Sequence, residues 1–469
     1  MIDRLRGGLL GRASWVTLCN VSGMGLAFLA QVLVARALGA EEFGRYALAL
    51  NWVFLGVMVV RLGLGSVIIR FVATYVAEQS WGLLRGLLRR TLLLQLAVAV
   101  AVAALVALLA KALPGLPASW TPGTLALSGL LLALLVVGQW IRDAFFGFQQ
   151  PVRALINDVL VPKGGLVVLA GLAVVGVFGV KADAEWALGW IALATSCGIL
   201  LGAALLARAL PRERLAHQPR HDSAGWMRVA FPLLVVNAAS EVTARADMLV
   251  LGSLAPPREA GIYATAVALS SLLGFFQGVA VTTLSPVFAA HHARGERAAM
   301  QALLTRGALL VTVLTLPMVA IMVLFGRTLL GFYGLEYQAG FHLLIILAVG
   351  HLIAAGTGVV GAVMTMTGQQ TLFAGITVGT ATVNTLLSII LVGAWGTTGA
   401  ALATLATAVL RAGALGAAVY SKLGLVPTVF GALLRKSNTV VPTVPARSEG
   451  TGSDGDVPAE GSAATGGRA

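Results

Sequence analysis

The chain has 469 residues, of which 58% are hydrophobic and only 11% are charged, and its mean hydropathy is +0.90. A soluble protein of this length could not cover its surface with so few charges, so composition excludes one and indicates a polytopic membrane protein. The net charge of +13 does not indicate a nucleic-acid partner. The basic residues gather in alternate connections between apolar segments, which is the pattern that sets topology in a membrane.

Twelve apolar segments of roughly 20 residues or more, the length that a bilayer core requires, follow one another along the chain. Their approximate limits are 14–38, 44–68, 90–112, 124–148, 155–179, 186–208, 228–254, 261–286, 305–326, 341–365, 372–394 and 398–420. Connections on the side of the N-terminus are the more basic ones, with residues such as Arg85, Arg212 and Arg297. The positive-inside rule therefore predicts a multi-pass protein of the cytoplasmic membrane with both termini in the cytoplasm.

An internal repeat relates the two halves of the chain. A shift of 217 residues (237 − 20) places Asn20 on Asn237, and it places Gly44-Arg45-Tyr46 on Gly261-Ile262-Tyr263. Each half contains six spans. Because six is an even number, both halves cross the membrane in the same orientation, and the repeat is parallel. The predicted fold class is all-α integral membrane, with twelve transmembrane helices in two pseudo-symmetric six-helix bundles around a central cavity. The predicted domains are residues 1–215, residues 216–436 and a disordered cytoplasmic tail, 437–469, which lacks apolar periodicity.

The seventh span is the most polar one at membrane depth. Asn237, Glu241 and Arg245 fall at i, i+4 and i+8, which makes one polar stripe on a helix, whereas Asp247 points roughly 160° away from Arg245. A charge at bilayer depth costs a few kcal/mol and is normally kept because it faces a cavity or a partner. We therefore expect this helix to line the working cavity of a membrane transporter.

Several motifs are spread over both halves in a consistent order. They are ARALGAEEFGRYALAL (35–50), RLGLGSVIIRFVA (61–73), ARADMLVLGSLAPPREAGIYATAVAL (244–269), LSPVFAAHHARGE (284–296), LFGRTLLGFYGLEYQAG (324–340) and MTMTGQQ (364–370). Together they resemble the motifs of Wzx-type polysaccharide and oligosaccharide-lipid flippases, a group of the multidrug/oligosaccharidyl-lipid/polysaccharide exporter superfamily. The resemblance implies two six-helix bundles and transport by alternating access, in which the cavity between them opens to one side of the membrane at a time. It also implies export of a polyprenyl-pyrophosphate-linked oligosaccharide repeat unit for surface polysaccharide biosynthesis. Arg61 stands where many relatives have an acidic residue, which favours an anion contact there.

Such a cargo needs cations at membrane depth, because an arginine fork binds phosphate oxygens bidentately. Arg61, Lys163 and Arg245 lie well inside spans and are the predicted headgroup contacts. Lys163 sits in VPKGG, where Pro162 and two glycines should break span five. The alternatives are an ion pair of Arg245 with Glu241, and snorkelling of Arg61 and Lys163 to the interface.

Glu241 and Asp247 are the candidates for coupling transport to protons or sodium ions, and the alternative is that each only neutralises an arginine. Arg142, Asp143 and Asp158 are interpreted as solvated interface residues. No ATPase or hydrolase motif, metal-binding spacing or cofactor motif occurs in the sequence, so an enzyme is not expected. The expected partners are the lipid-linked oligosaccharide, membrane lipid, a coupling cation and polysaccharide assembly proteins. Two other functions stay open: a multidrug or small-cation antiporter of the same superfamily, and a non-transporting scaffold with no cavity between the halves.

Overall fold

A computed structural model describes residues 2–112, 120–177, 179, 182–209, 218–220 and 222–426. Every regular element in these ranges is a helix, so the predicted all-α fold is confirmed. The predicted boundary between the halves, at 215–216, and the predicted tail, 437–469, lie outside the described residues. Both remain predictions.

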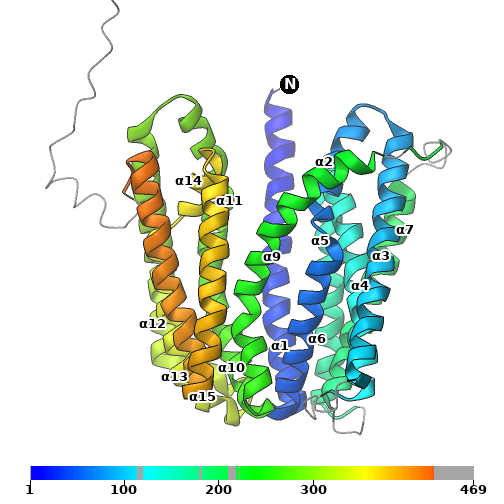
Figure 1. The fold of residues 1–469 in the computed structure, drawn as a ribbon, viewed down its shortest axis with the longest axis vertical. Coiled ribbons are helices and arrows are strands. Elements are labelled where there is room, and N and C mark those ends of the chain that lie inside the picture. The colour runs from blue at the N-terminus through cyan, green and yellow to red at the C-terminus, as the bar shows by residue number, and fades with distance from the viewer. Residues whose placement is uncertain are drawn as a thin grey trace, which may run out of the picture. The chain divides into compact units, whose positions relative to one another are not determined.

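The first half of the chain packs as a bundle of long helices. Contacts join α4 to α7, α6 to α7, α3 to α4 and α1 to α6, and Figure 1 shows these helices grouped together. The elements are α1 (Ile2–Arg61), α2 (Leu64–Ala77), α3 (Trp81–Ala112), α4 (Pro122–Gly147), α5 (Pro151–Leu155), the π-helix η1 (Ile156–Leu160), α6 (Val161–Val174) and α7 (Ala184–Ala209).

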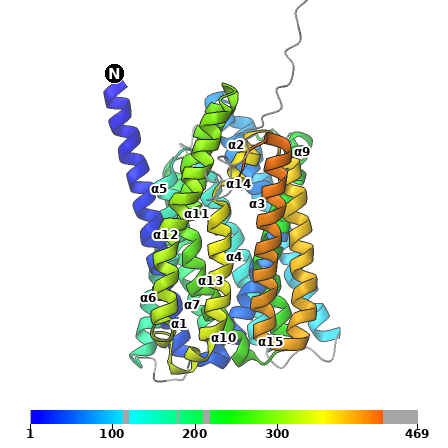
Figure 2. The same cartoon turned by 90° about the vertical axis from the view of Figure 1, so that its left-hand side faces the viewer.

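The second half repeats this plan. Figure 2 shows α12, α13 and α15 running alongside one another, in agreement with the contacts of α13 with both of the other helices. The elements are α9 (Ser223–Leu254), α10 (Pro257–Ser271), the 3-10 helix η2 (Leu272–Gly274), α11 (Phe275–Ala293), α12 (Arg297–Gly331), the 3-10 helix η3 (Leu335–Gly340), α13 (Phe341–Thr357), α14 (Val360–Met366) and α15 (Gln370–Leu423).

Two of the helices, α1 and α15, are each interrupted by a kink, which divides each into two helical segments, here called its first and second limbs. The apolar part of α1 has 47 residues, which is about 70 Å of helix and more than twice the thickness of a bilayer core. Its backbone leaves helical geometry at Gly39, where φ is 76° and ψ is 169°, a conformation that is essentially confined to glycine. Figure 1 shows the chain leaving the N-terminus along the first limb and returning along the second. α15 has the same kind of break at Trp395 and Gly396.

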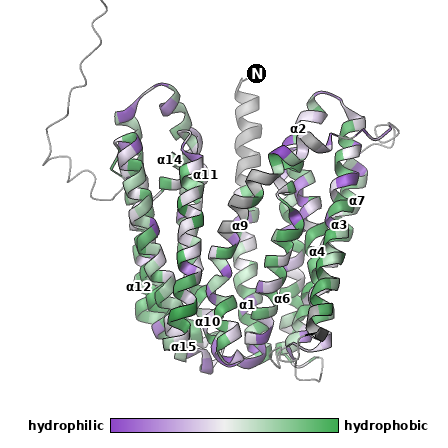
Figure 3. Cartoon of the chain, in the orientation of Figure 1, coloured by the Kyte–Doolittle hydropathy of each residue, from purple (hydrophilic) through white to green (hydrophobic). Residues whose placement is uncertain are grey.

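These breaks fall where the sequence predicts the ends of spans one and eleven. Nine described helices are long and apolar enough to cross a membrane, but α9 is not among them, and α1 and α15 are each counted once. The number of twelve crossings therefore remains a prediction. Figure 3 shows hydrophobic colour along the lengths of α3 and α12 and hydrophilic colour at many helix ends, as expected for membrane-spanning helices.

The internal repeat brings its two copies into contact at the end of the bundle where Gly39 lies. A Cβ atom added at Gly44 in α1 would overlap the carbonyl oxygen of Pro257 and lie 2.9 Å from the nitrogen of Gly261. One added at Gly261 in α10 would overlap the carbonyl oxygen of Ala40 and lie 3.0 Å from the nitrogen of Gly44. The shift of 217 maps Ala40 to Pro257 and Gly44 to Gly261, so this is a reciprocal contact of the kind that a two-fold axis produces.

Candidate functional site

Arg245 joins the two halves of the chain. Its Nε atom donates to Oε2 of Glu241 at 2.8 Å, and its Nη1 atom donates to Oδ1 of Asn51 in the second limb of α1 at 3.2 Å. The guanidinium also lies over the ring of Phe54, 4.5 Å from its centroid, in a favourable cation–π position. The predicted ion pair with Glu241 is therefore present, and Asn51 and Phe54 are two partners that the sequence did not indicate. The side chain of Asn237 is not among those that the structure describes.

Asp247 points away from this stripe, into the second half of the chain. Its carboxylate accepts hydrogen bonds from the hydroxyl of Tyr263 at 2.5 Å, the backbone N–H of Met248 at 2.8 Å and the hydroxyl of Thr404 at 3.4 Å. The residue is only 7% exposed, and within the described part of the chain it forms no ion pair. A buried carboxylate is costly when ionised, and the three hydrogen-bond donors offset part of this cost.

Arg61 belongs to a network of alternating charges in the first half. Its guanidinium pairs with Asp143 of α4, which is 3% exposed at its side chain, and Gly65 leaves the space that the guanidinium occupies. Asp143 also pairs with Arg142 at 3.2 Å, and Arg142 reaches Asp158 at 3.0 Å. The interpretation of Asp143 as a solvated interface residue is therefore wrong. It is the buried centre of an ion network, and no sequence pattern indicates that Arg61 and Asp143, 82 residues apart, meet.

Lys163 lies next to this network, but the helix around it does not break as predicted. VPKGG is the first turn of α6, and the distortion lies just before it, in the π-helix η1. The N–H of Val161 donates to the carbonyl of Ile156, five residues back. Because Pro162 has no N–H and its ring crowds the preceding turn, the wider π-turn accommodates it without ending the helix. Lys163 is half-buried and interacts electrostatically with Asp158.

Two of the three predicted cations thus come together, and the third stays apart. Arg61 and Lys163 flank the network formed by Arg142, Asp143 and Asp158. With three cations and two carboxylates, this cluster has a formal charge of 3 − 2 = +1. Arg245 lies on α9 with its own carboxylate, Glu241, for a formal charge of zero. The candidate site is therefore a cationic cluster in the first half and a balanced pair at the junction of the halves.

A cavity of about 630 Å³ lies between α1, α9 and α15. It is lined by Met58, Val59, Leu62, Leu234, Ala238, Val242, Val378, Ala381, Thr382 and Thr385. The two threonine hydroxyls donate to carbonyls of their own helix, at 3.1 and 3.0 Å, so neither hydroxyl proton is left for a ligand.

Two of the predicted site residues, Arg61 and Arg245, lie near this cavity along the chain but are not among its lining residues. Arg61 precedes the lining residue Leu62, and Arg245 lies one turn after Val242 on α9. The lining of this cavity is mainly hydrocarbon, and the assignment of these cations as headgroup contacts stays a prediction. Leu62 and Gly63 both have positive φ, at 49° and 71°, and this break between α1 and α2 brings Gly63 against the backbone of α9 at Ala230 and Leu234.

Comparisons with known proteins agree with this architecture. A family model described as polysaccharide biosynthesis protein matches residues 9–292, more than half of the chain. No curated protein matches the chain in sequence.

Solved structures share the fold at low identity. An inward-facing multidrug resistance MATE family transporter of the MOP superfamily has a TM-score of 0.66 and 16% identity over 88% of this chain and 96% of its own. The lipid II flippase MurJ, in an inward closed conformation, has a TM-score of 0.66 and 15% identity over 86% and 87%. A MOP superfamily transporter from Pyrococcus furiosus has a TM-score of 0.58 and 16% identity over 85% and 92%. At these identities the likeness establishes the fold.

Proposed function

Because the chain belongs to the polysaccharide biosynthesis protein family, we propose that it is a membrane flippase for an amphipathic cargo. This cargo is a polyprenyl-pyrophosphate-linked oligosaccharide repeat unit, which the protein moves across the cytoplasmic membrane by alternating access. The proposal makes the protein a transporter rather than an enzyme, with the cargo and the surrounding lipid as its partners and both termini in the cytoplasm. Polysaccharide assembly proteins are further candidate partners.

The observation that carries the proposal is the cavity between α1, α9 and α15. Its apolar lining suits the hydrocarbon chain of a polyprenyl lipid, and it lies between helices of both halves, where a cargo would pass. Arg61 immediately precedes the lining residue Leu62, and Arg245 lies one helical turn after the lining residue Val242. A lipid-linked pyrophosphate needs both environments: hydrocarbon for its chain and arginine for its phosphates.

In this proposal Arg61, Lys163 and Arg245 bind the pyrophosphate. Arg61 and Arg245 each already bind a carboxylate, Asp143 and Glu241 respectively. An arginine has five N–H donors in a planar fork, so each can contact a phosphate while it keeps part of its carboxylate contact. We further propose that Glu241 and Asp247 couple transport to a proton or sodium gradient.

The antiporter alternative has less support from the charges. A site for drug or small cations needs an excess of carboxylates beside the cavity, whereas the cluster around Arg61 is net positive and the Arg245–Glu241 pair is neutral. The scaffold alternative predicts packed protein between the halves, and a cavity of about 630 Å³ is present there. An anionic lipid-linked cargo therefore fits the described residues better than either alternative.

The test is neutralisation of both arginines in cells that depend on this protein for surface polysaccharide. We expect Arg61→Gln/Arg245→Gln to lower surface polymer by about tenfold or more at unchanged membrane abundance, because each charge-assisted hydrogen bond contributes roughly 1.5–3 kcal/mol. Arg61→Lys/Arg245→Lys keeps the charges and should restore part of the export.

Arg327→Gln is the matched control. Arg327 lies 5.4 Å from the ring centroid of Phe341, at the end of α12 remote from Arg61 in the sequence, and should not contact the cargo. Wild-type surface polymer in the double glutamine variant would refute the assignment of these arginines. A loss that Arg327→Gln reproduces would do the same.

A further inference from the structure

The start of α3 carries a concentration of positive charge. Arg85, Arg89 and Arg90 fall within its first three turns, and the helix contains no acidic residue. Arg85 and Arg89 are four residues apart, a spacing at which like charges repel along a helix. The arginines also lie toward the N-terminus of the helix, where its dipole disfavours cations. Of these three arginines, Arg89 and Arg90 carry the argument that follows.

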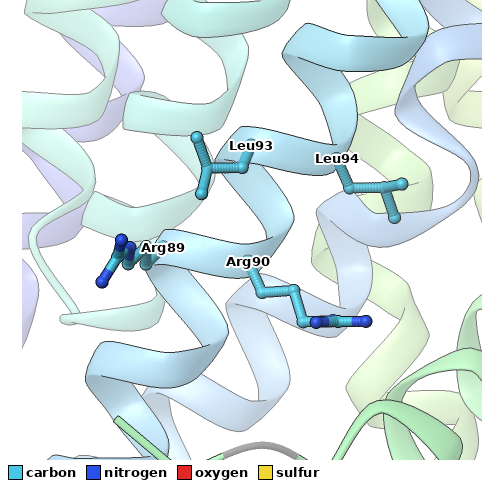
Figure 4. A pocket seen from close by; sticks show the side chains of 4 residues that line it. All are labelled: Arg89, Arg90, Leu93 and Leu94. Carbon is cyan, nitrogen blue, oxygen red and sulfur yellow. The ribbon is translucent and has the colours of Figure 1, made fainter. Parts of the chain in front are cut away.

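Arg89 and Arg90 border a hollow of about 390 Å³ together with Leu93 and Leu94. Figure 4 shows the four side chains on two successive turns of α3, with Arg89 and Leu93 on one side and Arg90 and Leu94 on the other. Both arginines are exposed, and neither forms a hydrogen bond or ion pair with any residue that the structure describes. Each guanidinium therefore retains its donors for a ligand.

An apolar stripe continues from this hollow along the outer face of α3. Leu93, Val100 and Leu108 are 55%, 65% and 64% exposed. The distance from Arg89 to Leu108 is about 28 Å at 1.5 Å per residue, close to the thickness of a bilayer core. If α3 spans the bilayer, this length puts the two arginines at its interface and the leucines one turn deeper.

We propose that Arg89, Arg90, Leu93 and Leu94 form a binding site for an anionic phospholipid of the surrounding bilayer. The two guanidinium groups bind its phosphate, and its acyl chains lie along the leucines and the apolar stripe. Basic pockets on transmembrane helices at the cytoplasmic interface bind anionic headgroups by this combination of charge and hydrocarbon contact. The site differs from the proposed cargo path, which lies between α1, α9 and α15.

The repeat supplies an internal comparison for this site. The shift of 217 places Arg89 on Arg306 and Leu93 on Leu310 in α12, and both of these are exposed. It places Arg90 on Gly307 and Leu94 on Val311, and both of these are buried. The second half therefore keeps one arginine–leucine pair, whereas the first half has two, and Arg306 serves as a control for a single interfacial arginine.

The test is native mass spectrometry of the purified full-length chain titrated with phosphatidylglycerol, phosphatidylcholine or a polyprenyl pyrophosphate. We expect the wild-type protein to bind phosphatidylglycerol in preference to phosphatidylcholine. Arg89→Gln/Arg90→Gln should lower the affinity for phosphatidylglycerol by about tenfold or more, whereas Arg306→Gln should leave it nearly unchanged. Size-exclusion profiles of all three proteins report whether each is folded.

Two results would overturn the proposal. One is equal phosphatidylglycerol binding by the wild-type and double-variant proteins, both monodisperse. The other is loss of polyprenyl pyrophosphate binding in the double variant with phosphatidylglycerol binding intact, which would assign the site to the cargo. Because the readout is lipid binding rather than export, the proposal can fail while the flippase function stands, and the reverse also holds.

Discussion

Asp143 determines how Arg61 can act. Its buried carboxylate lies between the guanidinium groups of Arg61 and Arg142, and a buried carboxylate is tolerated when it is paired in this way. Arg61 is therefore held in place rather than free to snorkel, although its side chain remains 26% exposed. In the proposed function, a cargo phosphate would meet a pre-oriented cation at Arg61, and this would reduce the entropy lost when the cargo binds.

Asp247 is the residue whose substitution we expect to affect ion coupling most. It is buried among hydroxyl groups and a backbone N–H without a described ion pair, whereas Glu241 is 41% exposed and paired with Arg245. We predict that Asp247→Asn makes flipping by reconstituted protein indifferent to an imposed proton or sodium gradient. Glu241→Gln should weaken this dependence less.

The measurement is the flipping rate in proteoliposomes with and without each gradient. Tyr263→Phe is a useful companion variant, because it removes one donor to Asp247 and keeps the carboxyl group. A variant with Asn at 247 that responds to the gradients as the wild type does would exclude Asp247 from coupling.

At the scale of elements, the reciprocal contact between Gly44 and Gly261 holds α1 against α10. A side chain at either position would overlap a carbonyl oxygen of the opposite helix. We predict that Gly44→Ala and Gly261→Ala each separate the two helices at this end of the bundle. The separation is measurable as a longer electron–electron distance between spin labels at positions 41 and 258, which are repeat-related and exposed.

The labelling requires prior replacement of the two native cysteines, Cys19 and Cys197. Gly25→Ala is the control, since a Cβ atom at Gly25 in the same helix would meet nothing within 4 Å. An unchanged distance distribution in both the Gly44 and the Gly261 variants would contradict a close helix contact at this point.

The all-α fold and the positions of the breaks at Gly39 and Trp395 could be predicted from sequence, because they depend on local patterns. Span length follows from bilayer thickness, and the shift of 217 predicted that Gly44 and Gly261 are equivalent. Helix interruptions were harder to predict. Leu62 adopts a positive φ that a bulky residue seldom takes, and it does so where Gly63 packs on α9. The π-turn before Pro162 likewise depends on its neighbours, because Asn157 in that turn packs directly against Gly198 and Gly202 of α7.

The partners of the candidate residues could be predicted only where they lie on the same helix. The Arg245–Glu241 pair follows from a spacing of four residues. The contact of Arg245 with Asn51 joins residues 194 positions apart, and no periodicity encodes such a contact. For the same reason, sequence alone places Asp143 at the solvated interface. Its position near the end of a span was readable, but its burial between two arginines depends on how α1 and α4 pack.

At the scale of the whole molecule, the two halves share a scaffold and differ in charge. The first half holds the Arg61–Asp143–Arg142–Asp158 network, and the second half holds Asp247 with its hydroxyl partners. The polar stripe of α9 meets the second limb of α1, where Arg245 contacts Asn51 and Phe54. This difference between the halves sets a cationic cluster beside an apolar cavity.

The central claim, movement of a lipid-linked oligosaccharide across the bilayer, is tested most directly in proteoliposomes that contain a fluorescent polyprenyl-pyrophosphate saccharide. A membrane-impermeant quencher added outside reports how much of this lipid reaches the outer leaflet. We predict that wild-type protein exposes the inner-leaflet pool, whereas Arg61→Gln/Arg245→Gln protein leaves it protected, as in protein-free liposomes. An inner-leaflet pool that stays protected in the presence of folded wild-type protein, with each gradient imposed, would contradict the account.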